Sequence, residues 1–431
     1  MFSPKLIKAH VQCRGTGAAL AILLLAVLIA AAAVRVAMPA QMADSDKLDR
    51  VRVAARLDPA NDAIRYRLAR REMEAGELVA ARQSLERAIQ LNCWRPEYWA
   101  DLARLCSATG DFACSDRAFE RVVELAPMRP RYTWERAAYL AVTGQRERAL
   151  AAFARYVQLS PNDAAAAFDT AERLYRDPNL VWTAIAKPAG SDAQIALLTW
   201  LAWRGQGEQT GLWWAQIGRG QLPAKAVRDY SEALVQHGNF ALAQSVWSKV
   251  ESIEPAPKAE AANGIYNPEF VLQPTNRGFD WHLAREWFVE PSIEEKDGRP
   301  ALRVNYSVGY NADSEPAYQF VRVEPNESYL LSAEAESDDI ASASGPRLRV
   351  LDAQCAPCLA VSSEQVVGTS EWKKLQLSFS TGPKTAFLRI SLFRPRARAF
   401  PMDITGTIWL RNFRLAASGP PAAGQEGEQA E

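Results

Sequence analysis

The chain has 431 residues, 48% of them hydrophobic and 23% charged, which is enough for two or three domains with buried cores. Its 50 basic and 50 acidic residues cancel, and no basic block follows the first residues, which excludes the charge pattern of a nucleic-acid-binding protein. Three histidines and six cysteines, without a pair of CxxC motifs or an HxxxH, offer few ligands for a metal, so we expect no metal centre and no cofactor.

An uncharged apolar segment covers residues 17–34. Its 18 residues would form roughly 27 Å of helix, close to the hydrocarbon thickness of a bilayer. Lys5, Lys8 and Arg14 precede it and Arg35 follows it, so the positive-inside rule predicts a cytoplasmic N-terminus. We expect an uncleaved anchor in the bacterial inner membrane, with the bulk of the chain in the periplasm. A cleaved signal peptide is the alternative, because residues 30–33 are all alanine.

A period of 34 residues runs through the next part of the chain. Glycines recur at positions 76, 110 and 144, and leucines at 57, 91, 125 and 159. A small residue stands five positions after each glycine and a large apolar one nine after it, and both return after Gly238. Glycine permits a tight turn between two helices, the small residue lets them approach, and the large one fills the gap. The spacing predicts stacked helix pairs.

This pattern resembles the tetratricopeptide repeat, as in "TGDFACSDRAFERVVELAP" and "TGQRERALAAFARYVQLSP". The resemblance implies an α-helical solenoid over residues 41–262, whose first helices line a concave groove for a protein partner. The residues that it places on the groove are Tyr66, Arg70, Met73, Arg104, Arg131 and Trp134. Successive arginines there would bind a carboxylate or an acidic peptide tail, and the alternative is an ordinary solvated helix face.

Four tryptophans lie in a less regular part of this region, where the period of 34 fails but apolar residues keep helical spacing. They are Trp200, Trp203, Trp213 and Trp214. We expect them to fill the core between irregular helices, and an exposed docking face is the alternative.

After Pro257 apolar and polar residues alternate, as in Leu302, Val304 and Tyr306. Turn sequences such as "KDGRP", "EPNES" and "TGPK" separate the alternating runs. About eight such strands, with no helical stretch between them, predict an antiparallel β-sandwich.

The order of "NPEF", "GFDW", "DGRPALRV", "VEPNESYLLSAEAES", "SEWKKLQLSFST" and "GTIWLRNFRL" resembles the jelly-roll carbohydrate-binding modules of glycoside hydrolases. The resemblance implies glycan binding, in which sugar rings stack on exposed aromatic residues and polar side chains bind the hydroxyls. The candidate contacts are Trp287, Tyr310 and Tyr318, with Asn311, Asp313 and Gln319, whereas Trp281 is expected in the core. Such modules often hold calcium with paired aspartates where this chain has Arg411 and Asn412, which makes calcium doubtful here.

A CAPC motif lies between two predicted strands, so its first cysteine does not begin a helix as thioredoxin-like redox chemistry requires. We expect a structural disulfide between Cys355 and Cys358, or two free thiols. Cys93, Cys106 and Cys114 can include another bridge, whose pairing the sequence leaves open.

The sequence contains no GxSxG, HExxH or phosphate-binding glycine loop. We expect a multidomain α plus β chain: cytoplasmic tip and transmembrane helix over residues 1–40, helical repeats over 41–262, a jelly-roll sandwich over 263–417 and a disordered acidic tail over 418–431. It would be a non-catalytic scaffold that docks proteins on its repeats and glycan on its sandwich. In this build the chain resembles accessory proteins of bacterial exopolysaccharide and envelope polysaccharide assembly. The alternatives are a polysaccharide-modifying or hydrolytic enzyme with its site in the sandwich, and a sandwich that only packs against the repeats.

Overall fold

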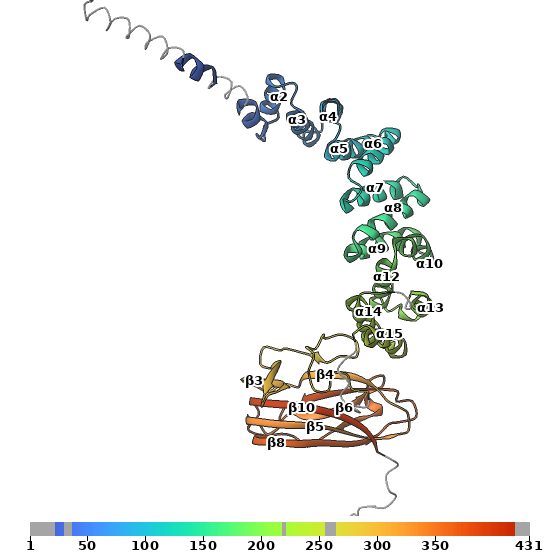
Figure 1. Cartoon of the computed structure of the whole chain (residues 1–431), viewed down its shortest axis with the longest axis vertical. Coiled ribbons are helices and arrows are strands. Elements are labelled where there is room, and N and C mark those ends of the chain that lie inside the picture. Colours follow the sequence, from blue (N-terminus) through green and yellow to red (C-terminus); the bar gives the residue numbers. More distant parts are fainter. Residues whose placement is uncertain (1–21, 30–36, 218–220, 255–263, 419–431) are drawn as a thin grey trace, which may run out of the picture. The chain divides into compact units, whose positions relative to one another are not determined.

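The computed structural model describes residues 22–29, 37–217, 221–254 and 264–418. The chain divides into two compact units, residues 1–160 and 161–431, and each is described by itself (Figure 1). Of the predicted membrane span, 17–34, only the helical residues 22–29 are described, and no helix within the described ranges is both long and apolar enough to cross a bilayer. The predicted start of the sandwich at Asn263 and the acidic tail after residue 418 lie outside the described residues.

Helix pairs form the first unit. After α2 (Leu48–Leu57) come α3 (Asp62–Glu74) with α4 (Leu78–Leu91), α5 (Pro96–Ala108) with α6 (Phe112–Leu125), and α7 (Pro130–Val142) with α8 (Arg146–Leu159). α5 and α7 begin at prolines, whose fixed φ and missing N–H suit the first turn of a helix. One period of 34 residues is therefore one helix pair, as predicted.

Glycine closes the turn inside each pair. Gly76, Gly110 and Gly144 have φ of +76° to +78°, in the left-handed region that favours glycine. The residues five and nine positions later are buried as predicted: Ala81, Ser115 and Ala149 are 0% exposed, and Leu85, Phe119 and Phe153 are at most 3% exposed. A disulfide between Cys106 and Cys114 also joins α5 to α6.

The second unit begins with irregular helices. Its elements are a 3-10 turn (Pro161–Asp163), α9 (Ala164–Tyr175), α10 (Pro178–Val181), a π-helical turn (Trp182–Ala186), α11 (Lys187–Ala189), α12 (Ser191–Trp203), α13 (Gly207–Ile217), α14 (Ala224–Gln236) and α15 (Phe240–Ile253). The short pieces between α9 and α12 interrupt the period of 34. The period's features return at α14 and α15, where Gly238 has φ +77° and Ala243 and Trp247 are buried.

The four tryptophans of this region differ in burial. Trp214 is 8% exposed, and Trp213 stacks on Trp182 with ring centroids 5.0 Å apart. Trp200 is half-buried, whereas Trp203 is 50% exposed. The prediction that all four fill the core is wrong for Trp203, because this last residue of α12 lies on a groove instead.

Within the described residues 264–418, ten strands form two five-stranded antiparallel sheets. They are β1 (His282–Leu283), β2 (Glu290–Lys296), β3 (Arg299–Tyr310), β4 (Ser314–Arg322), β5 (Ser328–Ala341), β6 (Arg347–Asp352), β7 (Ala360–Ser362), β8 (Gly368–Ser380), β9 (Phe387–Arg394) and β10 (Ile404–Ser418). The strand orders are β1-β4-β9-β6-β7 and β2-β3-β10-β5-β8. The last eight strands follow the order of a jelly roll: successive strands lie in opposite sheets, except β6 and β7, which pair with each other in one sheet.

The inward side chains of both sheets form one core. Leu302, Val304 and Tyr306 on β3 are at most 1% exposed, as their alternation predicted. Trp281 is fully buried, and its ring centroid lies 4.7 Å from that of Phe413. Trp281 therefore belongs to the core, as expected.

The last helix pair contacts the sandwich. The ring of Phe240 lies 5.2 Å from that of Phe320 and 5.4 Å from that of Phe387, and the ring of Trp247 lies 5.3 Å from that of Tyr266. These contacts place α14 and α15 in the same compact unit as the sandwich, and the division between the two units falls at residues 160 and 161. It lies inside the range 41–262 that we expected to form one helical domain.

Candidate functional site

A groove of about 620 Å³ lies on the helices of the second unit. Its walls come from α9, α12 and α14, and the residues that matter for its chemistry are Ile195, Thr199, Trp200, Trp203, Lys225 and Asp229. α12 and α14 are the first helices of their pairs, and first helices were expected to line a groove. We call this the tryptophan groove.

Its aromatic wall is partly available to a ligand. The Trp200 ring lies under the guanidinium of Arg204, whose Cζ is 4.8 Å from the ring centroid, but Trp203 is half-exposed. The wall from α14 carries an ion pair between Lys225 Nζ and Asp229 Oδ2 at 2.6 Å. The groove therefore offers apolar surface, one exposed indole and a paired cation and anion.

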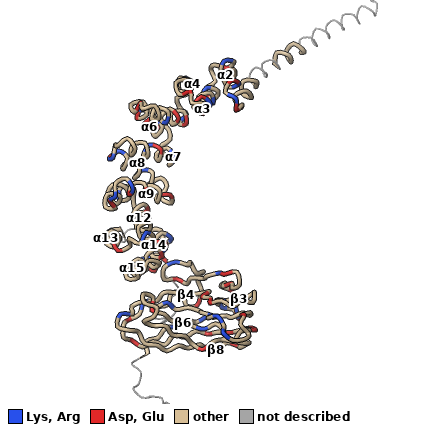
Figure 2. The backbone as a smooth tube through the Cα atoms, turned by 180° about the vertical axis from the view of Figure 1, so that it is seen from behind, with Lys and Arg blue, Asp and Glu red and all other residues tan. Residues whose placement is uncertain are grey.

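Two of the three arginines predicted for the repeat groove, Arg104 and Arg131, are engaged in ion pairs within the first unit. Arg104 pairs with Asp101, and Arg104 and Arg131 lie 3.8 and 2.9 Å from the same carboxylate, that of Glu135. Figure 2 shows basic and acidic residues side by side along these helices. A carboxylate ligand would have to displace Asp101 and Glu135, which weakens the expected arginine clamp.

The other predicted groove residues have different surroundings. The Tyr66 ring lies 4.5 Å from that of Tyr98, and burial and the neighbouring Asp101 raise the pKa of Tyr66. Trp134 packs on Phe153 at 5.8 Å between ring centroids. Met73 is half-buried, and Arg70 lines a small polar pocket of about 270 Å³.

Two of the predicted glycan contacts meet at one end of the sandwich. Trp287 is 67% exposed and Tyr310 42% exposed, and their ring centroids are 4.7 Å apart. Trp287 lies in a tight turn closed by Glu286 and Val289, whose N–H and C=O groups bond to each other. The ring of the buried Phe288 packs against that of Tyr310, with the two ring centroids 5.0 Å apart. These rings form an exposed aromatic surface of the kind that binds sugar rings.

The remaining predicted glycan contacts have structural partners. The side chain of Asn311 accepts from the N–H and donates to the C=O of Ala397, and Asp313 accepts from the N–H of Arg396 at 2.7 Å. Gln319 is fully buried and bonds both backbone groups of Tyr266. Tyr318 is held between the imidazole of His282 and the guanidinium of Arg389. Gln319 is therefore not a surface residue, contrary to the expectation, because its amide fixes the chain before β1.

A fully buried arginine organises the same end of the sandwich. Arg394 donates to the C=O groups of Ala312 (2.7 Å), Ser344 (3.1 Å) and Met402 (2.6 Å) and to the hydroxyl of Ser342 (3.1 Å). It joins the loops after β3, β5 and β9. Our sequence reasoning missed it, although Arg394 continues the inward-facing series Leu388, Ile390, Leu392 on β9.

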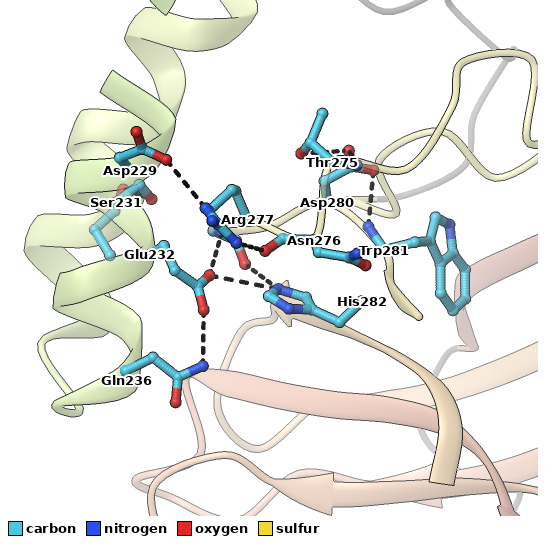
Figure 3. A network of polar contacts seen from close by, with 12 residues as sticks. Asp229, Ser231, Glu232, Gln236, Thr275, Asn276, Arg277, Asp280, Trp281 and His282 are labelled. Atoms are coloured by element: carbon cyan, nitrogen blue, oxygen red, sulfur yellow. Dashed lines mark hydrogen bonds and ion pairs between the residues drawn. The ribbon is translucent and has the colours of Figure 1, made fainter. Parts of the chain in front are cut away.

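Polar contacts tie α14 to the loop before β1 (Figure 3). Asp229 Oδ1 accepts from Arg277 Nε at 3.0 Å, and Glu232 Oε2 accepts from the N–H of Gly278 at 2.7 Å and lies 3.6 Å from His282 Nε2. We call the contact of α14 and α15 with residues 276–282 the seam. The seam and the tryptophan groove share Asp229.

The structure also shows the partners of the cysteines and of Arg411, which stands where carbohydrate-binding modules often have a calcium-binding aspartate. Cys355 and Cys358 form a disulfide in the loop between β6 and β7. In the described ranges the one group of side chains close enough to hold a metal is Cys106, Asp111 and Cys114, and its two sulfurs are bonded to each other. Arg411 forms an ion pair with Glu334 at 2.8 Å and covers the Trp372 ring.

No protein-family model matches the chain, and no curated protein matches it. Among solved structures, a CBM4 carbohydrate-binding module is similar over 36% of this chain and 99% of its own, at 13% identity and a TM-score of 0.28. YrrB, a TPR protein with an unusual peptide-binding site, is similar over 48% of this chain and 94% of its own, at 14% identity and a TM-score of 0.26.

The enzymatically active domain of tailspike protein 4 of bacteriophage CBA120 is similar over 36% of this chain, at 16% identity and a TM-score of 0.28. This chain spans only 22% of that protein. Because these identities and TM-scores are low, the fold is assigned from the helix pairs and the strand order described above and not from these similarities. The chain thus combines tetratricopeptide-like helix pairs with a β-sandwich.

Proposed function

We propose that this protein is a non-catalytic scaffold that binds a segment of a partner protein in the tryptophan groove. The observation that carries the proposal is the half-exposed indole of Trp203 in a groove of about 620 Å³. Tryptophans in partly buried pockets dominate many protein interfaces, because they bury a large apolar area and lose little conformational entropy. The wall from α14 carries the exposed Lys225, whose ammonium would exchange its ion pair with Asp229 for a polar group of an extended peptide.

The test is selection of random 12-residue peptides displayed on phage against the full chain. We expect enriched peptides whose affinity falls at least about tenfold in Trp203→Ala, a loss of roughly 1.4 kcal/mol. Trp94→Ala is the matched control, because Trp94 is 71% exposed in the first unit and lies outside the groove. Equal losses in both variants, or no enriched peptide, would contradict the proposal.

A second activity, glycan binding, is favoured by the exposed pair Trp287 and Tyr310. Sugar rings would stack on these side chains, while Asp313, which is exposed and three residues after Tyr310, offers its second carboxylate oxygen as an acceptor for hydroxyl groups. We expect binding on a glycan array to fall below detection in Trp287→Ala and to persist in Trp94→Ala. An array on which the folded wild-type chain binds no glycan would refute this activity and leave the peptide groove unaffected.

We further infer that the protein is anchored in the bacterial inner membrane by residues 17–34, with its units in the periplasm. In the described helix 22–29, the leucine, isoleucine and valine side chains are 57–69% exposed, and an apolar helix without partners is stable in lipid. A scaffold of this kind would raise the local concentration of its partners, and we propose that these partners belong to envelope polysaccharide assembly. Solubilisation of the protein from membranes by alkaline carbonate would argue against the anchor.

A further inference from the structure

The seam between the last helix pair and the sandwich contains one buried histidine. The imidazole of His282 belongs to β1, its side chain is 7% exposed, and its Nε2 lies 3.2 Å from the C=O of Gly278 and 3.6 Å from Glu232 Oε2. Figure 3 shows Glu232 reaching it from α14. The neutral imidazole, with its proton on Nε2, donates to Gly278 and leaves Glu232 to accept from the N–H of Gly278 and the amide of Gln236.

Charged and titratable groups face His282 from every element around it. Glu232 belongs to α14 and Asp280 to the preceding loop, while Tyr318 on β4 stacks on the imidazole at 4.6 Å between centroids. Arg389 on β9 lies 3.8 Å from the far side of the Tyr318 ring. Burial lowers the pKa of His282, an effect that Glu232 and the Gly278 carbonyl partly offset and that Arg389 reinforces.

The lowered pKa fixes the direction of the effect of pH. A closed seam binds fewer protons at His282 than an open one, so its stabilisation is complete above the ordinary histidine pKa of about 6.5 and is lost as the pH falls below it. Burial raises the pKa of Asp280, which acts in the opposite sense. Its carboxylate, however, bonds Thr275 and Trp281 of its own loop, so its protonation releases no contact with α14.

We propose that His282 and Glu232 form an acid-sensitive latch, which holds residues 276–282 on α14 at neutral pH and releases them when His282 is protonated. Protonation of His282 adds an N–H at Nδ1 that needs its own acceptor and a positive charge that needs solvation. In the seam the imidazole is only 7% exposed, which opposes both. Release also separates Arg277 from Asp229, the residue that the seam shares with the tryptophan groove. The latch itself does not rest on the proposed function, whereas any effect of its release on peptide binding in the tryptophan groove does.

Hydrogen–deuterium exchange of the full chain at pH 7.5 and pH 5.5 tests the latch, with rates corrected for the pH dependence of chemical exchange. We expect peptides covering 276–283 and α14 to exchange severalfold faster at pH 5.5, while β5 and β10 stay protected. His282→Gln, whose amide can still donate to Gly278, is expected to remove this response. His237→Gln is the matched control and is expected to keep it, because His237 lies at the end of α14 against Trp203, outside the seam.

A wild-type chain that exchanges equally at the two pH values would overturn the latch, as would a response that persists in His282→Gln. Glu232→Gln gives an independent test if His282→Gln does not fold. Its amide oxygen can still accept from Gly278, but it no longer stabilises a protonated His282. The ratio of the two exchange rates should therefore exceed that of the wild type, and an equal or smaller ratio would contradict the proposal.

Discussion

Replacing Arg394 with methionine is expected to lower the free energy of unfolding of the sandwich by about 3–5 kcal/mol. The guanidinium is fully buried and donates to three C=O groups and one hydroxyl from three loops. Methionine fills a similar volume but removes the donor from the C=O groups of Ala312, Ser344 and Met402, whereas Ser342 Oγ still accepts from the N–H of Ser344. Each buried unsatisfied acceptor costs about 1–3 kcal/mol. The protection of β5 and β10 against hydrogen exchange measures the loss.

Two variants separate the lost hydrogen bonds from other effects of the substitution. Arg394→Lys keeps a charge but cannot reach four acceptors at once, so its loss should be smaller than that of methionine. Arg398→Met changes the same side chain on the exposed surface nearby and should stay within about 0.5 kcal/mol of the wild type. Similar values for Arg394→Met and Arg398→Met would show that the buried network contributes little.

Gly278→Ala is expected to destabilise the second unit by about 2–4 kcal/mol. Gly278 has φ +55°, and an added Cβ would lie 2.7 Å from the indole of Trp247 and 2.8 Å from Ser231 Oγ. Trp247 is 1% exposed and Ser231 is fully buried, so neither can move away without disturbing α14 and α15. A thermal scan should show a transition several degrees lower, and peptides of the seam should lose protection first.

Gly238→Ala is the matched control for this prediction. Gly238 has φ +77° in the turn between α14 and α15, but an added Cβ there would meet no atom within 4 Å. Only the cost of the left-handed backbone applies, about 1 kcal/mol. If both variants lose the same amount, steric contact at the seam is not the cause, and the close approach of Gly278 to Trp247 has no energetic role.

The parts that the sequence predicted well are those fixed by local spacing. The buried series on β3 and the left-handed glycines at the helix turns follow from periods of 2 and 34 residues, which reflect the strand and the helix pair. Trp281 was also placed correctly, because turn residues flank it next to a strand.

The parts that were missed depend on contacts between distant residues. Glu232 and Gly278 are 46 positions apart and belong to segments of different composition, so no period joins them. Trp203 and Trp214 have the same side chain and similar neighbours, yet one lines a groove and the other is buried, because the packing of α12, α13 and α14 decides. The predicted arginine groove overlooked Asp101 and Glu135, which form ion pairs with Arg104 and Arg131 within the first unit.

Arg394 determines under which solution conditions the loops next to Trp287 and Tyr310 keep their conformation. The three loops that it joins include Asn311 and Ala312, which directly follow Tyr310. The guanidinium of Arg394 is covalently attached to the chain, so, unlike a bound ion, it cannot dissociate from the sandwich whatever the composition of the surrounding solution. The geometry of these loops is therefore set when the chain is synthesised and does not follow the supply of any dissolved ion.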